Sequence, residues 1–591
     1  MVASEKILFA RRRLEEVANL DLVGDLQWDE ATRVWYILVK IHVDNPINIS
    51  ITEDTMWYIV LQDEYPEGEV KIYPAINGGI ENTFNHQSNN GLLCSNNLWR
   101  KGKLCLNDPY DEIKGIRSEP NNYEDKLYWN AKRAVEWVSA AARNQLVKKG
   151  DFYEIPEFRI RKEHHIIYNE DIVSMMEWED SQEYYGYVDL WCAGNNKYYV
   201  DDYVNTSGML CKATRWGKHT SECKEKIRGA WILLKEEPVI KGWQAPNNFK
   251  ELKQAFKHQK FEFRDILEKL IPRFRDGKKH ILMIGFPVPK KIGEDACIIH
   301  WEAFLLPVLS FGKKYAKGFR NNELGWKRRD FQEILTDEKN LDWLLSENWN
   351  SSEILNRGCF NKVMTRSKFL LIGAGTLGAS IGEQLVRGGV YSLTIMDDDI
   401  YSIGNLARHV LSVDSVDKYK ANELAKRFNS INPNINVKFI SSALTKENIE
   451  VINEYDIILD CTANNDVLYL LSSYETKRKK KYISISFGYK AEVLYFAYQR
   501  GSKFELERYI ANFSTKLKEN ERAICDKELP WEGIGCWSPV FPAMAADVQL
   551  VASFSTIIIK TILEQDLYDE KYYIYERVND EDGVIKGFVR V

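Results

Sequence analysis

The sequence predicts three domains in a chain of 591 residues: an α+β domain over 1–155, a mixed α/β domain over 156–355 and a doubly wound α/β domain over 356–591. Three observations predict this division. The N-terminal part has the pattern of helix, strands, long loop and helix. The middle part contains two apolar runs joined by a charged turn. The C-terminal part alternates short apolar strands with helical segments.

The N-terminal domain begins with a helical spacing of apolar residues over 5–19. Three runs typical of strands follow, RVWYILVKIHV, MWYIVLQ and EVKIYPA, separated by turn-rich pieces. An Asn- and Gly-rich stretch over 75–122 then precedes an amphipathic helical pattern, KLYWNAKRAVEWVSAAARNQLV. Helix, antiparallel meander, long loop and helix together predict one α+β domain.

The middle domain is expected to contain two paired strands, HILMIGFPVPKK and ACIIHWEAFLLPVL, and its sequence contains no recognisable catalytic constellation.

In the C-terminal domain the runs KFLLIGAG, SLTIMDDD, NVKFISSA, YDIILDCT and KYISISFG predict the buried strands of a mainly parallel sheet. The basic run TKRKKK, residues 476–481, is interpreted as a solvated helix end.

Composition and charge exclude several classes of function. A net charge of −6 argues against a nucleic-acid-binding protein, because phosphate contacts need a basic surface. The N-terminus MVASEKILFARRRLEE lacks the apolar region of a signal peptide. The late run VQLVASFSTIIIKTIL is interrupted by Lys560 and falls short of the roughly 20 residues that span a bilayer. We therefore expect a cytoplasmic protein with no membrane partner.

Ten cysteines occur without a C-x-x-C pair. In a cytoplasmic chain they are expected to be reduced thiols, most of them inert core residues. A structural zinc site is not expected, because its ligands usually come in such pairs.

A glycine-rich turn follows the first strand of the C-terminal domain. In LLIGAGTLGASIGEQL, Gly373, Gly375 and Gly378 form G-x-G-x-x-G between a strand and a helix, where backbone N–H groups can bind a phosphate. Asp397 ends the next strand, 19 residues after Gly378, where it can bind a ribose. These features fit NAD, FAD or ATP, and a glycine turn without a ligand is the structural alternative.

The residues after Asp397 favour ATP over a dinucleotide used for redox chemistry. A second carboxylate, Asp399, belongs to the same predicted site. A polyphosphate needs several fixed donors and cations, which a nicotinamide does not. Candidates for these groups are Asn405, Arg408 and Lys420. Asp460 ends a later strand in YDIILDCTANND, where a carboxylate at the sheet edge can hold Mg²⁺ beside the phosphates.

The order D-x-D, N-L-x-R, K-x-K-A and D-C-T-x-N resembles the adenylation domain of ubiquitin-activating enzymes and their bacterial ThiF/MoeB-type relatives, which activate sulfur-carrier proteins. The resemblance covers residues 357–591. It implies that Asp397 binds the ribose and that Asp460 binds Mg²⁺. It also implies phosphate contacts from Asn405, Arg408 and Lys420. The activity implied is adenylation of a protein's C-terminal carboxylate, after which a thiol can capture the acyl adenylate.

Two cysteines near the end of the chain are candidates for that thiol. Cys536 lies in GIGCWSPVFPAMAADVQL, in a Gly-flanked loop before a helix start, where a thiolate is activated. Cys525 in RAICDKELP is followed directly by an acid, which disfavours its thiolate. We therefore predict Cys536 as the acceptor and Cys525 as the alternative. A buried inert cysteine is the structural explanation for either.

The N-terminal domain contains a second candidate thiol. GKLCLNDP resembles the active-site G-x-x-C-L of ubiquitin-conjugating enzymes, YPEGEVKIYPA resembles their P-x-x-x-P strand, and Trp129 opens the helix behind. On that resemblance Cys105 is an acceptor thiol. Cys94 is the weaker alternative, and a core cysteine between Leu104 and Leu106 is the structural one.

This domain departs from the family at a motif before the cysteine. The conjugating enzymes usually have His-Pro-Asn there, and the Asn helps to stabilise the oxyanion. Here NTFNHQSNN retains His86 but has Gln87 and Ser88 in place of Pro and Asn. The residues that can replace the missing donor are Asn85, His86, Asn89 and Asn107.

The whole chain resembles the ubiquitin-like conjugating proteins that accompany cGAS-like nucleotidyltransferases in bacterial CBASS antiphage operons. That family implies an inactive adenylation-like middle domain and a homodimer. It also implies that the C-terminus of a cGAS-like nucleotidyltransferase is the substrate and that target lysines receive it. The implied path runs from ATP and carboxylate to acyl adenylate, then to thioesters on Cys536 and Cys105, and finally to an amide.

Three other functions are consistent with parts of the sequence. A sulfur-carrier adenylyltransferase would not need the N-terminal domain or Cys105. An NAD oxidoreductase would not need Arg408 and Lys420 beside the phosphates. A non-enzymatic scaffold with a relic nucleotide-binding fold would not turn over ATP.

Overall fold

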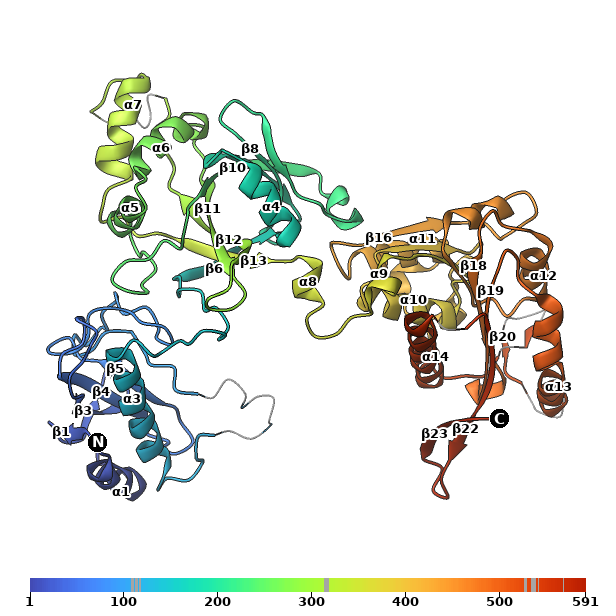
Figure 1. Ribbon diagram of the computed structural model, residues 1–591, viewed down its shortest axis with the longest axis horizontal. Coiled ribbons are helices and arrows are strands. Elements are labelled where there is room, and N and C mark those ends of the chain that lie inside the picture. The colour runs from blue at the N-terminus through green and yellow to red at the C-terminus, as the bar shows by residue number, and fades with distance from the viewer. Residues whose placement is uncertain are drawn as a thin grey trace. The chain divides into compact units, whose positions relative to one another are not determined.

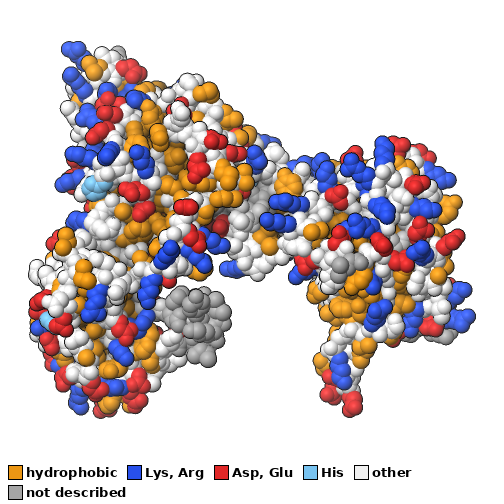
Figure 2. All heavy atoms as spheres, viewed as in Figure 1, with side chains coloured by type: hydrophobic (Ala, Val, Ile, Leu, Met, Phe, Trp, Pro, Cys, Tyr) orange, Lys and Arg blue, Asp and Glu red, His pale blue; other side chains and the backbone are white. Residues whose placement is uncertain are grey.

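Figure 1 shows the computed structural model of the chain. The structure describes residues 1–107, 111, 115, 118–312, 318–525, 529–532, 538, 539, 541–566 and 568–591. They form two compact units, one of residues 1–214 and 225–348 and the other of 215–224 and 349–591. On the face drawn in Figure 2, basic and acidic side chains are interspersed over both units.

The N-terminal part of the first unit is an antiparallel meander packed against helices, as predicted. Alternate residues of strand β3 are buried, and they pack with helices α1 and α3 around one apolar core. The hydroxyl of Ser4 caps α1 by accepting a hydrogen bond from the N–H of Ile7. The elements are α1 (Glu5–Arg13), β1 (Leu20–Leu22), β2 (Gln27–Asp29), β3 (Val34–His42), β4 (Asp54–Gln62), β5 (Val70–Pro74) and α3 (Lys126–Ala142).

The rest of the first unit contains an eight-stranded mixed sheet in the order β6-β13-β12-β11-β10-β7-β8-β9. Helices α5 and α6 pack on one face and α4 on the other, each over its own apolar core. The two predicted strands are the antiparallel neighbours β11 and β12. The strands are β6 (Ile160–Tyr168), β7 (Tyr185–Cys192), β8 (Lys197–Val204), β9 (Leu210–Ala213), β10 (Glu225–Leu233), β11 (His280–Pro289), β12 (Ala296–Leu306) and β13 (Trp343–Asn348). The helices include α4 (Ile172–Asp180), α5 (Phe249–His258), α6 (Phe263–Leu270) and α7 (Glu323–Arg329).

The second unit is built on a sheet in the order β16-β15-β14-β17-β18-β19-β22-β23. The first five strands of this order are parallel, and the last three continue it antiparallel. The chain leaves β14 in both directions, so a switch point lies between β14 and β17. The strands are β14 (Lys368–Ile372), β15 (Ser392–Met396), β16 (Asn436–Ile440), β17 (Ile457–Asp460), β18 (Lys480–Phe487), β19 (Val493–Gly501), β22 (Glu570–Asn579) and β23 (Ile585–Arg590).

Helices cover both faces of this sheet, which confirms the predicted doubly wound α/β fold. One core joins the sheet to α10, α11 and α14, and a second core on the opposite face joins it to α12 and α13. The helices are α8 (Ser351–Ile354), α9 (Lys362–Arg366), α10 (Thr376–Arg387), α11 (Lys420–Asn429), α12 (Asn465–Ser473), α13 (Leu506–Cys525) and α14 (Ala545–Gln565). The two-residue strands β20 (Trp531–Glu532) and β21 (Ser538–Pro539) form a separate pair.

Helix α14 is the one helix among the described residues that is long and apolar enough to cross a membrane. Half of its most apolar window is buried inside the unit, however, and the helix packs against the sheet core with α10. We therefore interpret α14 as a core helix, as the sequence predicted for this run.

The basic run 476–481 is solvated in part, as predicted, because residues 477–479 are exposed, but it is not a helix end. Helix α12 ends at Ser473, and Lys480 is a buried residue at the start of β18. Its ammonium donates to the carbonyls of Asn453 and Tyr455, at 2.8 and 2.5 Å. Burial lowers the pKa of Lys480. The lysine thus satisfies carbonyls at the end of a 3₁₀-helix, Ile449–Glu454.

A short strap, residues 215–224, lies between β9 and β10 in sequence but belongs to the second unit. The N–H of Gly217 donates to the carbonyl of Pro433 at 2.7 Å, and that of Lys218 donates to Ile435 at 3.0 Å. A Cβ at Gly217 would lie 2.0 Å from the Ile435 carbonyl oxygen. Only glycine therefore permits this approach of the two backbones.

Candidate functional site

The three glycines of the turn after β14 serve different purposes. Gly373 has a φ of +93°, and an added Cβ would lie 2.9 Å from the Thr462 side chain. A Cβ at Gly378 would lie 2.0 Å from the Gly373 carbonyl oxygen. Gly375, by contrast, has no neighbour within 4 Å of an added Cβ and leads α10 without a side-chain cap. The free N–H groups at the start of α10 therefore lie beside open space in which a phosphate can bind.

Asp397 ties the glycine turn to the end of β15. Its carboxylate accepts hydrogen bonds from Ala374 N–H at 2.6 Å and from Asp399 N–H at 2.8 Å. Burial raises the pKa of Asp397, while these backbone donors oppose the shift. Lys420 is buried and its ammonium lies 2.8 Å from an oxygen of Asp399. The two predicted carboxylates and the predicted lysine are therefore connected in the structure.

The other predicted phosphate ligands lie on the segment between β15 and α11. Asn405 accepts from the N–H and hydroxyl of Ser402, at 3.0 and 3.1 Å, and so caps a short 3₁₀ turn. Arg408 is half-buried, and its guanidinium donates to the carbonyl of Phe541. The positions of both side chains are therefore set by protein contacts, and a phosphate contact from Arg408 would add to or replace the bond to Phe541.

His409, which sequence reasoning did not select, also holds the glycine turn. Its Nδ1 accepts from Leu411 N–H at 3.2 Å, so Nε2 carries the proton and donates to the Ala374 carbonyl at 2.9 Å. Burial lowers the pKa of His409 to about 4. The available signal was the position of His409 directly after Arg408 of the N-L-x-R motif, but the sequence does not reveal the contact with Ala374.

Asp460 lies at the carboxyl end of β17, beside the end of β14. It is 2% exposed. One oxygen accepts from the N–H and hydroxyl of Thr462, at 3.0 and 2.6 Å, and the other from the Ser484 hydroxyl at 2.8 Å. Burial raises the pKa of Asp460. Thr462 and Ser484 are contacts that sequence reasoning missed.

Different residues of this site suit a phosphate and a cation. The open space at Gly375 and the uncapped start of α10 fit a phosphate. A cation next to Asp460 would favour the ionised form, which burial alone disfavours. Each carboxylate oxygen still has lone-pair capacity beyond the hydrogen bonds that it accepts. Asp460 therefore stays the predicted Mg²⁺ ligand, with Thr462 and Ser484 orienting it.

Cys105 lies in a separate site in the first unit. Its thiol is exposed, whereas the flanking Leu104 and Leu106 are buried, so the alternative of a core cysteine is wrong. Cys94 is partly buried. The residue is held by its backbone, since its N–H donates to the His86 carbonyl at 2.9 Å. The thiol borders a cavity of about 630 Å³.

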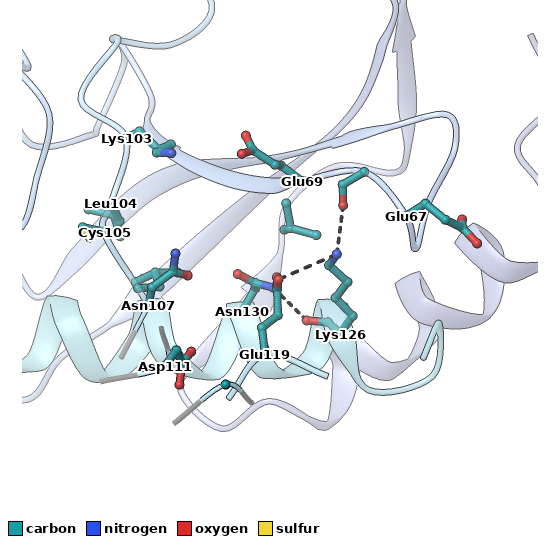
Figure 3. Close-up of a pocket in the computed structure, with 14 residues that line it drawn as sticks. Glu67, Glu69, Lys103, Leu104, Cys105, Asn107, Asp111, Glu119, Lys126 and Asn130 are labelled. Carbon is teal, nitrogen blue, oxygen red and sulfur yellow. Dashed lines mark hydrogen bonds and ion pairs between the residues drawn. The ribbon is translucent and has the colours of Figure 1, made fainter. Parts of the chain in front are cut away.

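Figure 3 shows this cavity, with Cys105 and Asn107 near one another and Lys126 and Asn130 projecting from α3. Lys126 is anchored, because its ammonium donates to the carbonyls of Pro66 and Gly68 at 2.8 and 2.9 Å. Asn130 donates to Glu119 at 2.7 Å. Lys126, Asn130 and Glu119 are thus held by hydrogen bonds and an ion pair, and four acidic side chains in all line the cavity, Glu67, Glu69, Asp111 and Glu119.

The four candidates for the oxyanion donor lie in different environments. Asn107 is exposed and lines the cavity beside Cys105. Asn89 is 7% exposed, and its amide nitrogen donates to the Ala245 carbonyl and to Asn247. Asn89 therefore cannot reach an oxyanion without losing those bonds. His86 is exposed and Asn85 half-buried.

Cys536 lies outside the residues that the structure describes. Cys525 is the last residue of α13, and its side chain also lies outside the described part. The choice between the two thiols therefore stays a prediction. Among the described cysteines, Cys461 is buried behind the glycine turn, and burial raises the pKa of its thiol, so it is unsuited to thiol chemistry.

Comparison with known proteins covers nearly the whole chain. Residues 144–349 match the Cap2 central linker domain and residues 348–576 match the ThiF family. The ATP-dependent ubiquitin transferase-like protein Cap2 of Enterobacter hormaechei subsp. hoffmannii is 30% identical over 542 residues, which is 89% of this chain and 89% of that protein.

Other relatives match shorter parts of the chain. A molybdopterin-synthase adenylyltransferase of Haemophilus influenzae is 40% identical over 103 residues, 17% of this chain and 42% of that enzyme. A solved structure of E. coli MccB with AMPCPP and MccA is 16% identical, covering 39% of this chain and 64% of that one with a TM-score of 0.28.

The match to Cap2 and the two domain matches agree with the order of the folded parts along the chain and with the glycine-turn site after β14. ATP is the nucleotide that the ThiF match implies. The chain therefore belongs to the Cap2 family of ATP-dependent ubiquitin transferase-like proteins and is an ATP-dependent adenylating enzyme with its ThiF-type domain in the second unit.

Proposed function

We propose that the chain activates the C-terminal carboxylate of a partner protein with ATP, carries the acyl group on Cys536 and then on Cys105, and joins it to a target amine. The substrate that we infer is the C-terminus of a cGAS-like nucleotidyltransferase, in antiphage defence, and the target amines are lysines. We further infer that the chain works as a homodimer in the cytoplasm. The division into domains at residues 155/156 and 355/356 belongs to the same proposal.

The observation that carries the proposal is the exposed thiol of Cys105 beside a cavity, on the same chain as the adenylating fold. An exposed cysteine held in a fixed loop can accept an acyl group and present it to an amine. A sulfur-carrier adenylyltransferase, the second candidate function, ends its chemistry at the second unit and has no use for this thiol.

The first reaction takes place at the glycine turn. An oxygen of the substrate carboxylate attacks the α-phosphorus of ATP, the acyl adenylate forms and pyrophosphate leaves. The uncapped start of α10 at Gly375 supports phosphate binding there, and the carboxylate of Asp397 beside the same turn is proposed to bind the ribose. Charge on the phosphates is balanced by Lys420 and Arg408. When bound, Mg²⁺ would supply further charge neutralisation next to Asp460.

Two acyl transfers and an aminolysis follow. The Cys536 thiolate attacks the adenylate carbonyl and AMP leaves; the Cys105 thiolate then attacks that thioester and releases Cys536. Finally an amine attacks the thioester on Cys105, loses its proton and releases the thiolate. Asn107, on the cavity wall, is the side chain best placed to donate a hydrogen bond to the oxyanion of the last step.

The proposal is tested by incubating the full chain with ATP, Mg²⁺ and a cGAS-like nucleotidyltransferase. A covalent adduct that disappears with reductant, and that is absent in Cys105→Ala/Cys536→Ala, supports the proposal. Pyrophosphate release without any thioester at Cys105 would favour the sulfur-carrier type of activation. Absence of both ATP turnover and adduct with every such partner would contradict the proposal.

A further inference from the structure

Residues 83–91, which we call the bridging segment, contact the Cys105 loop along one edge. The N–H of Cys105 donates to the His86 carbonyl at 2.9 Å, and the N–H of Ser88 donates to the Lys103 carbonyl at 2.9 Å. The amide of Gln87 donates to the Gly102 carbonyl at 3.1 Å. The backbone of the acceptor cysteine is thus held by the bridging segment.

The other edge of the bridging segment contacts residues of the stretch 144–349, which matches the Cap2 central linker domain, begins before the proposed boundary at 155/156 and is called the linker domain below. Glu154 accepts from the N–H of His86 at 2.8 Å, and the same oxygen lies 3.4 Å from His86 Nδ1. Glu157 accepts from the N–H of Asn89 at 2.9 Å. The N–H of Trp243 donates to the Thr83 carbonyl at 2.8 Å. One residue, His86, therefore carries both a bond to the linker domain, through its N–H, and a bond to Cys105, through its carbonyl.

The fit along this edge is close. Asn89 and Asn247 exchange amide hydrogen bonds at 3.3 Å in both directions, and each is 7% exposed. A Cβ at Gly91 would lie 2.3 Å from the amide nitrogen of Gln244, and one at Gly242 would lie 2.5 Å from the Thr83 carbonyl oxygen. Buried amides that satisfy each other specify one arrangement of the two surfaces.

His86 links the two edges in an uncommon conformation. Its φ is +57°, in the left-handed region that residues other than glycine adopt rarely and at a cost. A charged acceptor on the N–H of that residue stabilises the conformation, because hydrogen bonds to an ionised group are stronger than neutral ones. The carbonyl of the same residue then faces Cys105 N–H in a fixed direction.

We propose that the linker domain positions the acceptor thiol, with Glu154 as the positioning residue. Its carboxylate holds His86, and His86 holds the backbone of Cys105 so that the thioester lies at a constant place relative to the cavity and Asn107. This assigns a role to the domain in which the sequence shows no catalytic residue. The inference rests on the proposed function, because Cys105 must be the acceptor for its position to matter.

The test compares Glu154→Ala and Glu154→Gln in the full chain, with Asp151→Ala as the control. The carboxylate of Asp151 lies three residues away and accepts from Lys148 N–H instead. Two quantities are measured: single-turnover discharge of the charged enzyme to free lysine, and hydrogen exchange at the Cys105 amide. Thermal unfolding and ATP–pyrophosphate exchange establish that each variant is folded and still activates substrate.

We expect Glu154→Ala to discharge about tenfold more slowly, since a displacement of the reacting group by ~1 Å can cost about 10²-fold. Exchange at the Cys105 amide should be about tenfold faster. Glu154→Gln, whose amide oxygen can accept the same bond, should recover most of both values, and Asp151→Ala should match wild type.

If Glu154→Ala discharges and exchanges like wild type, the inference is wrong while the proposed function stands. An equal loss in Glu154→Gln and Glu154→Ala would also overturn it, because a positioning bond should be rescued by the isosteric amide. If wild-type Cys105 never accepts an acyl group, the proposed function itself fails. The hydrogen-exchange comparison, which needs no substrate, then still reports whether Glu154 holds the loop.

Discussion

His409 and Asp397 hold the two backbone groups of Ala374 from opposite sides of the glycine turn. Asp397 accepts from the N–H and His409 donates to the carbonyl, so the peptide groups on both sides of Ala374 are oriented before a ligand arrives. Fixed donors and acceptors lower the reorganisation needed during reaction. The preparation of the nucleotide site therefore depends on two side chains of which one was not evident from the sequence.

Two of the three glycines, Gly373 and Gly375, can be separated by experiment. Gly375→Ala should leave the thermal midpoint within a few degrees of wild type but weaken ATP binding, since its Cβ enters the open space beside the start of α10. Gly373→Ala should instead destabilise the second unit, by roughly 1–3 kcal/mol, because its φ of +93° disfavours a side chain. Calorimetry and ATP titration measure both. Equal destabilisation by the two substitutions would contradict this assignment.

His409 predicts a pH dependence of stability. Its pKa of about 4 in the folded chain lies below the usual value of about 6.5, so the unfolded chain binds the extra proton in between. The stabilisation is complete above pH ~6.5 and is lost as pH falls toward 4, by up to about 1.4 kcal/mol per pH unit.

Denaturant unfolding of wild type and His409→Gln between pH 4 and 7 checks the prediction. The variant keeps a donor for the Ala374 carbonyl but cannot titrate, so its stability should fall less steeply over this range. Buried Asp397 and Asp460, whose raised pKa values act in the opposite direction, are present in both proteins and cancel in the difference. Parallel curves for the two proteins would refute the role of His409.

Asp460 should be required for activation rather than for folding. Asp460→Ala should abolish ATP–pyrophosphate exchange with the substrate protein. Lys420→Ala and Arg408→Ala should weaken the same exchange because they remove charge near the phosphates. Asp460→Asn is the matched control for loss of charge with retained shape, and circular dichroism monitors the fold. Wild-type exchange in Asp460→Ala would remove Asp460 from the proposed site.

At the scale of elements, the sequence predicted the meander, the paired strands β11 and β12 and the parallel strands β14 to β18, because each has a strong apolar pattern. It did not predict that β19, β22 and β23 extend the sheet antiparallel, since pairing order depends on contacts distant in sequence. Helix α3 also ends at Ala142, earlier than the apolar pattern suggested, before Asn144 takes a left-handed conformation.

For a similar reason, the sequence predicted the local motifs of the candidate sites but not the contacts between them. Motif spacing identified the glycine turn, its carboxylates and Cys105, because each motif is local. Contacts such as Asn89 with Asn247 or Asp460 with Ser484 join segments far apart in sequence, so no local pattern indicates them. For the same reason the sequence could not show that the amide of Asn89 is already hydrogen-bonded within the protein, which makes Asn89 a poor candidate for the oxyanion donor.

Asn107 is, of the four candidates for the oxyanion donor, the one that lines the cavity beside Cys105. Asn107→Ala should charge normally but discharge to lysine about 10²–10³-fold more slowly, the typical effect of losing one oxyanion donor. Asn85→Ala and His86→Ala, measured in the same single-turnover assay, are the comparison variants. Normal discharge in Asn107→Ala would assign the donor to another of these residues or to a backbone N–H.

At the scale of the whole molecule, the proposed function combines two kinds of chemistry that need different surroundings. Activation requires a nucleotide held at the start of a helix, which the parallel sheet of the second unit provides. Conjugation requires an exposed thiol beside a cavity, which the meander domain of the first unit provides. Serial thioesters divide one difficult acyl transfer into steps that each unit can carry out separately.

The most direct test of the account is the order in which the two thiols are charged. After incubation with ATP, Mg²⁺ and a cGAS-like nucleotidyltransferase, each full-length cysteine variant is digested without reductant and its thioester peptides are mapped by mass spectrometry. We predict that Cys536→Ala forms adenylate but charges neither thiol, and that Cys105→Ala accumulates a thioester on Cys536 and makes no conjugate. Charging of Cys105 in Cys536→Ala, or its loss only in Cys525→Ala, would contradict the proposed relay.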